Sequence, residues 1–151
     1  VLRTGGKKAA AITLAGDAVK GLIPVLIGHA IGVPVESLAL VALAAFFGHL
    51  YPVFFGFKGG KGVATAFGGL VALSWPVGGA LLLTWIAVAY LFKISLLSAL
   101  VAAALAPVYF YLWTNNIVLV LISLFIAIIL FWRHRSNIRQ LIRGGEEKIQ
   151  G

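Results

Sequence analysis

Long apolar runs with almost no charge dominate this chain of 151 residues. A helix needs roughly 20 apolar residues to cross the hydrocarbon core of a bilayer, and several of the runs approach that length. Hydrophobic residues make up 62% of the sequence and charged residues 11%, with a mean hydropathy of +1.07. So few charges leave too little polar surface to cover a soluble globule. The runs therefore predict an all-α, polytopic membrane helix bundle.

Turn residues divide the chain into six apolar segments, which we expect to be six transmembrane segments. Glycine, proline and asparagine mark the turns, and Ser74 followed by Pro76 resembles the start of a new helix. The third segment is short, so it is either a full span or a half-span buried among its neighbours. The expected segments are residues 9–31, 37–55, 63–73, 76–92, 94–113 and 117–132.

Basic residues gather on one side of this arrangement. If all six segments cross the bilayer, both ends of the chain and every second turn share one side. That side holds all twelve Lys and Arg residues except Lys20. Membrane proteins retain Lys and Arg on the cytoplasmic side. We therefore expect both ends of the chain to be cytoplasmic, with residues 1–151 forming a single integral-membrane domain.

Composition also narrows the chemistry. The chain has no cysteine, which excludes disulfides, thiolate metal sites and cysteine nucleophiles. Its formal net charge is +8. In so apolar a chain, lipid headgroups or a phosphorylated substrate are better expected partners than nucleic acid. No metal-ligand cluster is visible, and nothing indicates a cofactor. The chain begins at Val1 and contains no Met, so we expect it to be part of a longer protein.

Asp17 and Lys20 place charge inside the first segment. A lone ionised side chain in the bilayer costs at least about 2.5–3.5 kcal/mol, but residues three apart share a helix face and can pair. Gly16 and Gly21 flank the two and permit another helix to approach closely. Two interpretations stay open: a structural ion pair inside the bundle, or the edge of a substrate site.

A glycine-rich loop with two lysines joins the second and third segments. Glycines let backbone N–H groups approach a ligand, and the loop enters a helix N-terminus, which favours an anion. The pattern suits phosphate, although it is not a Walker A loop because Gly62 follows Lys61. The alternative is an ordinary cytoplasmic turn. The candidate phosphate-binding residues are His49, Lys58, Gly59, Gly60, Lys61, Gly62 and Thr65.

The basic tail is the third polar region. Read as a helix, it places His134, Asn137 and Leu141 on one face and a series of arginines, four residues apart, on another. One interpretation is an interfacial helix that binds anionic lipid. The other turns His134 and Asn137 toward a site at the membrane surface.

Four sequence strings together resemble the bacterial acyl-phosphate:glycerol-3-phosphate acyltransferases, the PlsY family. The resemblance covers essentially the whole chain. It implies seven spans, of which this chain supplies the last six, without the first helix and most of the first motif. The strings are His49-x-x-Pro52 with the stretch from Phe57 to Thr65, Arg133-His134-x-x-Asn137-Ile138 with Gly144-x-Glu146, Asp17-x-x-Lys20-Gly21, and Leu2-Arg3-Thr4-x-Gly6.

This resemblance implies acyl transfer from a fatty acyl phosphate to the 1-hydroxyl of glycerol 3-phosphate, at the cytoplasmic face of the bacterial inner membrane. The products would be lysophosphatidic acid and phosphate, in the first step of phospholipid synthesis, with no cofactor and no metal. Lys61 and its loop, helped by Arg3, would bind one phosphate. His134 and Asn137 would form the catalytic glycerol 3-phosphate site, with either His134 or the substrate's own phosphate as general base.

Two other function classes compete with acyl transfer. The first is a small membrane transporter for a phosphorylated solute, in which Asp17 and Lys20 would line the path. The polar groups, however, gather at one face rather than across the bilayer. The second is a non-catalytic membrane anchor subunit, which would tolerate substitution in the loop from Lys58 to Thr65.

Overall fold

The computed structural model describes residues 2–52, 60–145 and 148–149, and only the backbone of residues 2–5. Every regular element in these ranges is an α-helix. By its contacts the chain divides into two compact units, Val1–Ser74 and Trp75–Gly151, and each is described by itself.

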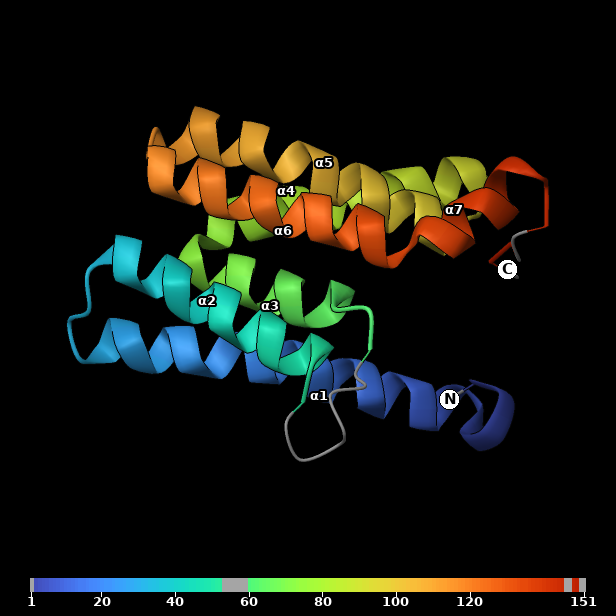
Figure 1. The fold of residues 1–151 in the computed structure, drawn as a ribbon, viewed down its shortest axis with the longest axis horizontal. Coiled ribbons are helices and arrows are strands. Elements are labelled where there is room, and N and C mark those ends of the chain that lie inside the picture. Colours follow the sequence, from blue (N-terminus) through green and yellow to red (C-terminus); the bar gives the residue numbers. More distant parts are fainter. Residues whose placement is uncertain (1, 53–59, 146–147, 150–151) are drawn as a thin grey trace. The chain divides into compact units, whose positions relative to one another are not determined.

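The first unit contains three helices, α1 (Leu2–Ala30), α2 (Val35–Leu50) and α3 (Val63–Leu73). Each of the three packs on the other two (Figure 1). The turn between α1 and α2 lies at one end of this unit, and α1 extends beyond α2 at the other (Figure 1). Near its start, α1 is broken at Gly6, whose φ of 74° is not helical.

The second unit contains α4 (Trp75–Phe92), α5 (Ser95–Thr114), α6 (Ile117–Arg133) and α7 (Arg135–Ile142). Helix α5 packs against both α4 and α6, and α7 leaves α6 at a bend of 64°. The turn after α4 and the bend before α7 lie at the same end of this unit (Figure 1). There the N–H of Ile149 donates a 2.5 Å hydrogen bond to the carbonyl of Lys93.

Most helix bounds agree with the segments predicted from the sequence, and the third agrees at both ends. Two ends differ more: α1 begins at Leu2 and not at residue 9, and α2 ends at Leu50 and not at residue 55. Tyr51 has φ −133° and ψ 65°, outside the helical region. It precedes Pro52, and the proline ring disfavours helical backbone at the residue before it. The predicted residues 53–55 lie outside the described part of the chain.

The described helices include fewer full-length spans than the six predicted. Residues Gly6–Ala30, α4 and α5 are long and apolar enough to cross a membrane, and α6 with α7 makes a fourth candidate if the bent pair is one span. Helix α2 has 16 residues and α3 has 11. At a rise of 1.5 Å per residue, α3 is about 16 Å long, roughly half the hydrocarbon thickness. The chain is thus a multi-span helical bundle.

Large apolar side chains cover much of the outer surface of the second unit. Leu83 is 68% exposed, Leu112 73% and Trp75 80%. A soluble protein rarely exposes so much contiguous apolar surface, whereas lipid acyl chains solvate it without cost. These helices are therefore built to contact a bilayer on their outer faces.

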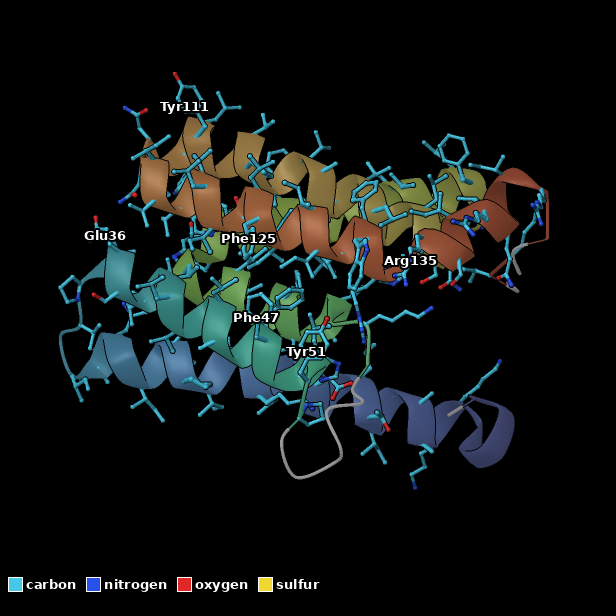
Figure 2. All side chains as sticks on the ribbon, viewed as in Figure 1. Glu36, Phe47, Tyr51, Tyr111, Phe125 and Arg135 are labelled. Carbon is cyan, nitrogen blue, oxygen red and sulfur yellow. The ribbon has the colours of Figure 1, made fainter. Side chains whose placement is uncertain are left out.

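Apart from Lys20 within α1, the described basic residues lie toward one end of each unit. In the first unit, Lys7 and Lys8 belong to the start of α1, and Lys61 precedes Gly62, the N-cap residue of α3. At the other end of α2, Figure 2 shows Glu36. In the second unit, Lys93 and the arginines of α7 share an end, and the turn between α5 and α6 carries no Lys or Arg.

Glycines allow α1 and α3 to approach until their backbones touch. A Cβ added at Gly21 would overlap the carbonyl oxygen of Thr65, and one added at Gly68 would overlap the carbonyl oxygen of Ala18. The hydrophobic effect does not drive helices together in lipid. Small residues at such crossings stabilise helix association through close van der Waals packing instead. This crossing fixes the start of α3 against the middle of α1.

Replacing Gly21 with alanine is therefore expected to separate α1 from α3 and to destabilise the protein by about 1–3 kcal/mol, the usual cost of overpacking. Gly16→Ala is the matched control on the same helix, because a Cβ there has nothing within 4 Å. Unfolding of both variants by SDS titration in mixed micelles measures the difference. Equal stability of the two variants would show that the crossing is not as tight as described.

Candidate functional site

Asp17 on α1 is the centre of a polar cluster in the first unit. Its Oδ1 lies 2.8 Å from Nζ of Lys20 and 3.6 Å from Nδ1 of His49 on α2. The Asp17 side chain is 24% exposed and that of His49 10%, so water only partly screens the carboxylate. The predicted pairing with Lys20 is present. The approach of His49 was missed, because it comes from another helix and no local spacing signals it.

Thr65 ties this cluster to the start of α3. Its Oγ1 donates a 2.8 Å hydrogen bond to the backbone carbonyl of Asp17, and the residue is only 1% exposed. A buried hydroxyl requires a partner, so this bond fixes the first turn of α3 beside the carboxylate of Asp17. A threonine hydroxyl has a single proton. Thr65 can therefore donate to a phosphate through its backbone N–H but not through this hydroxyl.

Two glycines of the loop lie against the side chains of α2. A Cβ at Gly60 would lie 2.5 Å from Nε2 of His49, so the imidazole occupies the space that a side chain would need. Gly62 has φ +90°, a left-handed conformation that favours glycine, and a Cβ there would collide with the ring of Phe46. The loop thus places Lys61 between two glycines, directly before α3.

The start of α3 suits an anion. The first N–H groups of a helix have no acceptor within the helix, and the helix dipole adds positive potential at this end. The first turn of α3 contains no acidic residue, and Lys61 is exposed next to it. Fixed positive charge and backbone donors therefore coincide at one helix terminus.

His134 occupies the bend between α6 and α7. It is 7% exposed, and its φ of −98° and ψ of 10° end the first helix and begin the second. Nδ1 lies 2.7 Å from the carbonyl oxygen of Leu130. A carbonyl only accepts, so Nδ1 carries the proton, and Nε2 of the neutral ring is the basic nitrogen. The backbone of α6 thus selects the tautomer that makes Nε2 a proton acceptor.

The two predicted faces of the tail helix are present in α7. His134 is buried and Asn137 half-buried, whereas the arginines of the helix are exposed. The helix ends where Gly144 adopts φ 74° and its N–H donates to the carbonyl of Leu141. His134 and Asn137 therefore lie on the protein-facing side.

Some predicted site residues lie outside the described part of the chain. These are Lys58 and Gly59, together with the side chain of Arg3, whose backbone belongs to α1, and the motif residue Glu146 also lies outside. Among the residues that are described, no three His, Asp or Glu side chains are close enough to bind a metal ion together. The described polar groups suit anion binding and proton transfer.

Comparison with known proteins identifies the family. A sequence profile described as glycerol-3-phosphate acyltransferase matches residues 1–144. The glycerol-3-phosphate acyltransferase of Methylococcus capsulatus is 56% identical over 149 residues, which cover 99% of this chain and 75% of that protein. The chain belongs to the glycerol-3-phosphate acyltransferase family. A second member, from Thioalkalivibrio sulfidiphilus, is also 56% identical, over 99% of this chain and 73% of that protein.

Solved structures of this family agree with the fold. Two crystal structures of the integral membrane glycerol 3-phosphate acyltransferase PlsY, one in a glycerol 3-phosphate form and one in a lysophosphatidic acid form, superpose with TM-scores of 0.92 and 0.90. Each is 33% identical and matches 99% of this chain, which covers 75% and 76% of those proteins respectively. The resemblance drawn from the four motifs is thus confirmed. The chain is a multi-pass membrane acyltransferase of phospholipid synthesis.

Proposed function

We propose that this acyltransferase uses a fatty acyl phosphate as donor and the 1-hydroxyl of glycerol 3-phosphate as acceptor. The hydroxyl oxygen attacks the acyl carbon, the bond from that carbon to the phosphate oxygen breaks, and lysophosphatidic acid and phosphate are released. The ligands of the related crystal structures, glycerol 3-phosphate and lysophosphatidic acid, support this acceptor and product. Both substrates carry phosphate, so binding them depends mainly on fixed positive charge and backbone donors.

The first unit supplies the phosphate-binding part of this proposal. The single observation that carries it is the start of α3, where the exposed Lys61 and the loop glycines meet the helix N-terminus. Lys61 and the N–H groups of the first turn bind a phosphate, with Lys58 and Arg3 as further cations. Gly59 extends the glycine loop.

Asp17 is proposed to position the cations at the edge of this site. Its carboxylate contacts both Lys20 and His49, while its carbonyl accepts the hydrogen bond from Thr65. The two interpretations of the ion pair are therefore compatible. The pair compensates the charge of the partly buried Asp17, and Asp17 also holds His49 against Gly60 at the entrance to the loop.

The second unit supplies the proposed base. The proposed acceptor of the hydroxyl proton of glycerol 3-phosphate is Nε2 of His134, because Nδ1 donates to the carbonyl of Leu130. Asn137, on the same face of α7, is proposed to orient that substrate. The alternative acceptor of the proton is the substrate's own phosphate, which needs no side chain.

The proposed topology has six spans in this chain and seven in the full protein, with both ends cytoplasmic. The separation of basic residues to one end of each unit supports it. Helices α2 and α3 are shorter than the other spans, and the proposal counts each of them as a short span, with α3 packed on α1 and α2. The active site is then cytoplasmic, in a bacterial inner membrane, where both phosphorylated substrates are available.

Phosphate release from palmitoyl phosphate tests this function directly. It is measured with and without glycerol 3-phosphate, on this chain and on a version extended by the first helix and first motif of its relatives. We expect release by the extended version to depend on glycerol 3-phosphate and to equal lysophosphatidic acid formation. Transport of glycerol 3-phosphate into liposomes without any product from palmitoyl phosphate would instead favour the transporter.

A further inference from the structure

The outer face of α7 carries a stripe of positive charge that the proposed reaction does not use. Arg135, Arg139 and Arg143 follow one another at four-residue spacing, which aligns them along one side of a helix, and all three are exposed. His134 and Asn137 lie on the other side of α7. We propose that this stripe binds the phosphates of anionic phospholipids at the membrane surface.

The position of α7 places the stripe at the boundary of the bilayer. Helix α6 has 17 residues, about 25 Å at the standard rise, which nearly crosses the hydrocarbon core. Each arginine would cost at least about 2.5 kcal/mol inside that core. Helix α7 leaves α6 at 64°, so with α6 upright α7 runs more along the membrane plane than across it.

Two apolar side chains beside the stripe favour a lipid surface over a soluble acidic partner. Trp132, the last residue but one of α6, is 52% exposed, and Ile142 at the end of α7 is 80% exposed. Tryptophan is enriched where membrane meets water. A helix with arginines on one face and exposed apolar groups beside them is typical of binding at the headgroup level.

Arg135 is already oriented for this role. Its Nη1 donates a 2.9 Å hydrogen bond to the carbonyl of Trp132, and its Cζ lies 4.5 Å from the centre of the Trp132 ring. Figure 2 shows Arg135 at the bend between α6 and α7. The guanidinium still has donors left for a phosphate, because arginine carries five N–H groups. The ring restricts the side chain to the interface and so lowers the entropy cost of binding.

The test measures which lipid contacts Trp132. In the full-length protein every tryptophan other than Trp132, including Trp75, Trp85 and Trp113, is replaced by phenylalanine. The protein is placed in mixed vesicles of phosphatidylcholine and phosphatidylglycerol. Quenching of Trp132 by brominated phosphatidylglycerol is divided by quenching by brominated phosphatidylcholine. This ratio cancels changes in fluorescence yield within one variant and reports the preference for the anionic lipid.

The arginine variant is Arg135→Gln, Arg139→Gln and Arg143→Gln together. Its control is Lys7→Gln with Lys8→Gln and Lys148→Gln. It removes the same number of positive charges from other exposed positions. We expect the quenching ratio of the arginine variant to be at least about fivefold lower than that of the protein with unmodified arginines. This is roughly the effect of one basic residue at an anionic surface. The quenching ratio of the control should stay within about twofold of the value before the lysines are replaced. About 1 M NaCl should lower the ratio by screening the charges.

Three results would overturn the proposal. The first is an unchanged preference in the arginine variant, and the second is an equal loss in the control, which would point to net charge. The third is a response of Trp132 to soluble glycerol 3-phosphate that disappears in the arginine variant, since the stripe would then collect substrate. None of these readouts requires acyl transfer, so they stand or fall separately from the proposed reaction. Circular dichroism of each variant verifies that it is folded.

Discussion

His134→Asn in the full-length enzyme is expected to lower kcat by about 10²-fold or more, the usual contribution of a general base. Asparagine can still donate a hydrogen bond to the carbonyl of Leu130, which the imidazole Nδ1 now satisfies at 2.7 Å. It has no atom equivalent to the basic Nε2. The variant should therefore retain the bend between α6 and α7 while losing proton transfer. Lysophosphatidic acid formation at saturating substrates measures kcat.

Two companion variants separate chemistry from structure at this position. His134→Ala removes both the hydrogen bond and the base, so it should lose activity together with some thermal stability. Ser136→Ala changes an exposed neighbour on α7 and should leave both unchanged. Near-normal turnover of His134→Asn would exclude Nε2 as the base and favour proton transfer to the substrate's own phosphate.

Lys61→Ala is expected to reduce kcat/KM by about 10²- to 10³-fold, the range found when a charge-stabilising donor is removed. Lys61 is the cation placed between Gly60 and Gly62 at the start of α3, so its loss leaves the backbone N–H groups to bind phosphate alone. Because the residue is exposed, the fold should not depend on it. Initial rates over a range of palmitoyl phosphate concentrations, with folding checked by thermal unfolding, measure the effect.

Lys61→Arg and Lys7→Ala are the matched controls for this prediction. Arginine restores the charge but not the compact ammonium, so activity should return only in part. Lys7 is an exposed lysine near the start of α1, and its removal should change the rate by less than about twofold, as expected for a surface charge outside the site. If Lys7→Ala impairs the enzyme as much as Lys61→Ala, general positive charge attracts the substrate and the loop is not a specific phosphate site.

Local patterns in the sequence were enough for the helices and for the family. Apolar runs between turn residues located α3 at its observed bounds and most of the other helices to within a few residues, because burial in lipid and backbone hydrogen bonding act on contiguous stretches. The end of α2 was predicted too late, since hydropathy alone outweighed the effect of Pro52 on Tyr51. The three-residue spacing of Asp17 and Lys20 was also enough to predict their ion pair, because both residues lie on one helix.

Only the tertiary structure decided which distant groups meet. It brings His49 to Asp17, commits the Thr65 hydroxyl to an α1 carbonyl, and sets Gly21 against the backbone of α3. It likewise places the carbonyl of Leu130 where it accepts a hydrogen bond from Nδ1 of His134. Contacts between helices depend on where the helices cross, and they are sensitive to shifts of a few tenths of an ångström. A linear sequence carries the residue types for such contacts but not the geometry that makes them.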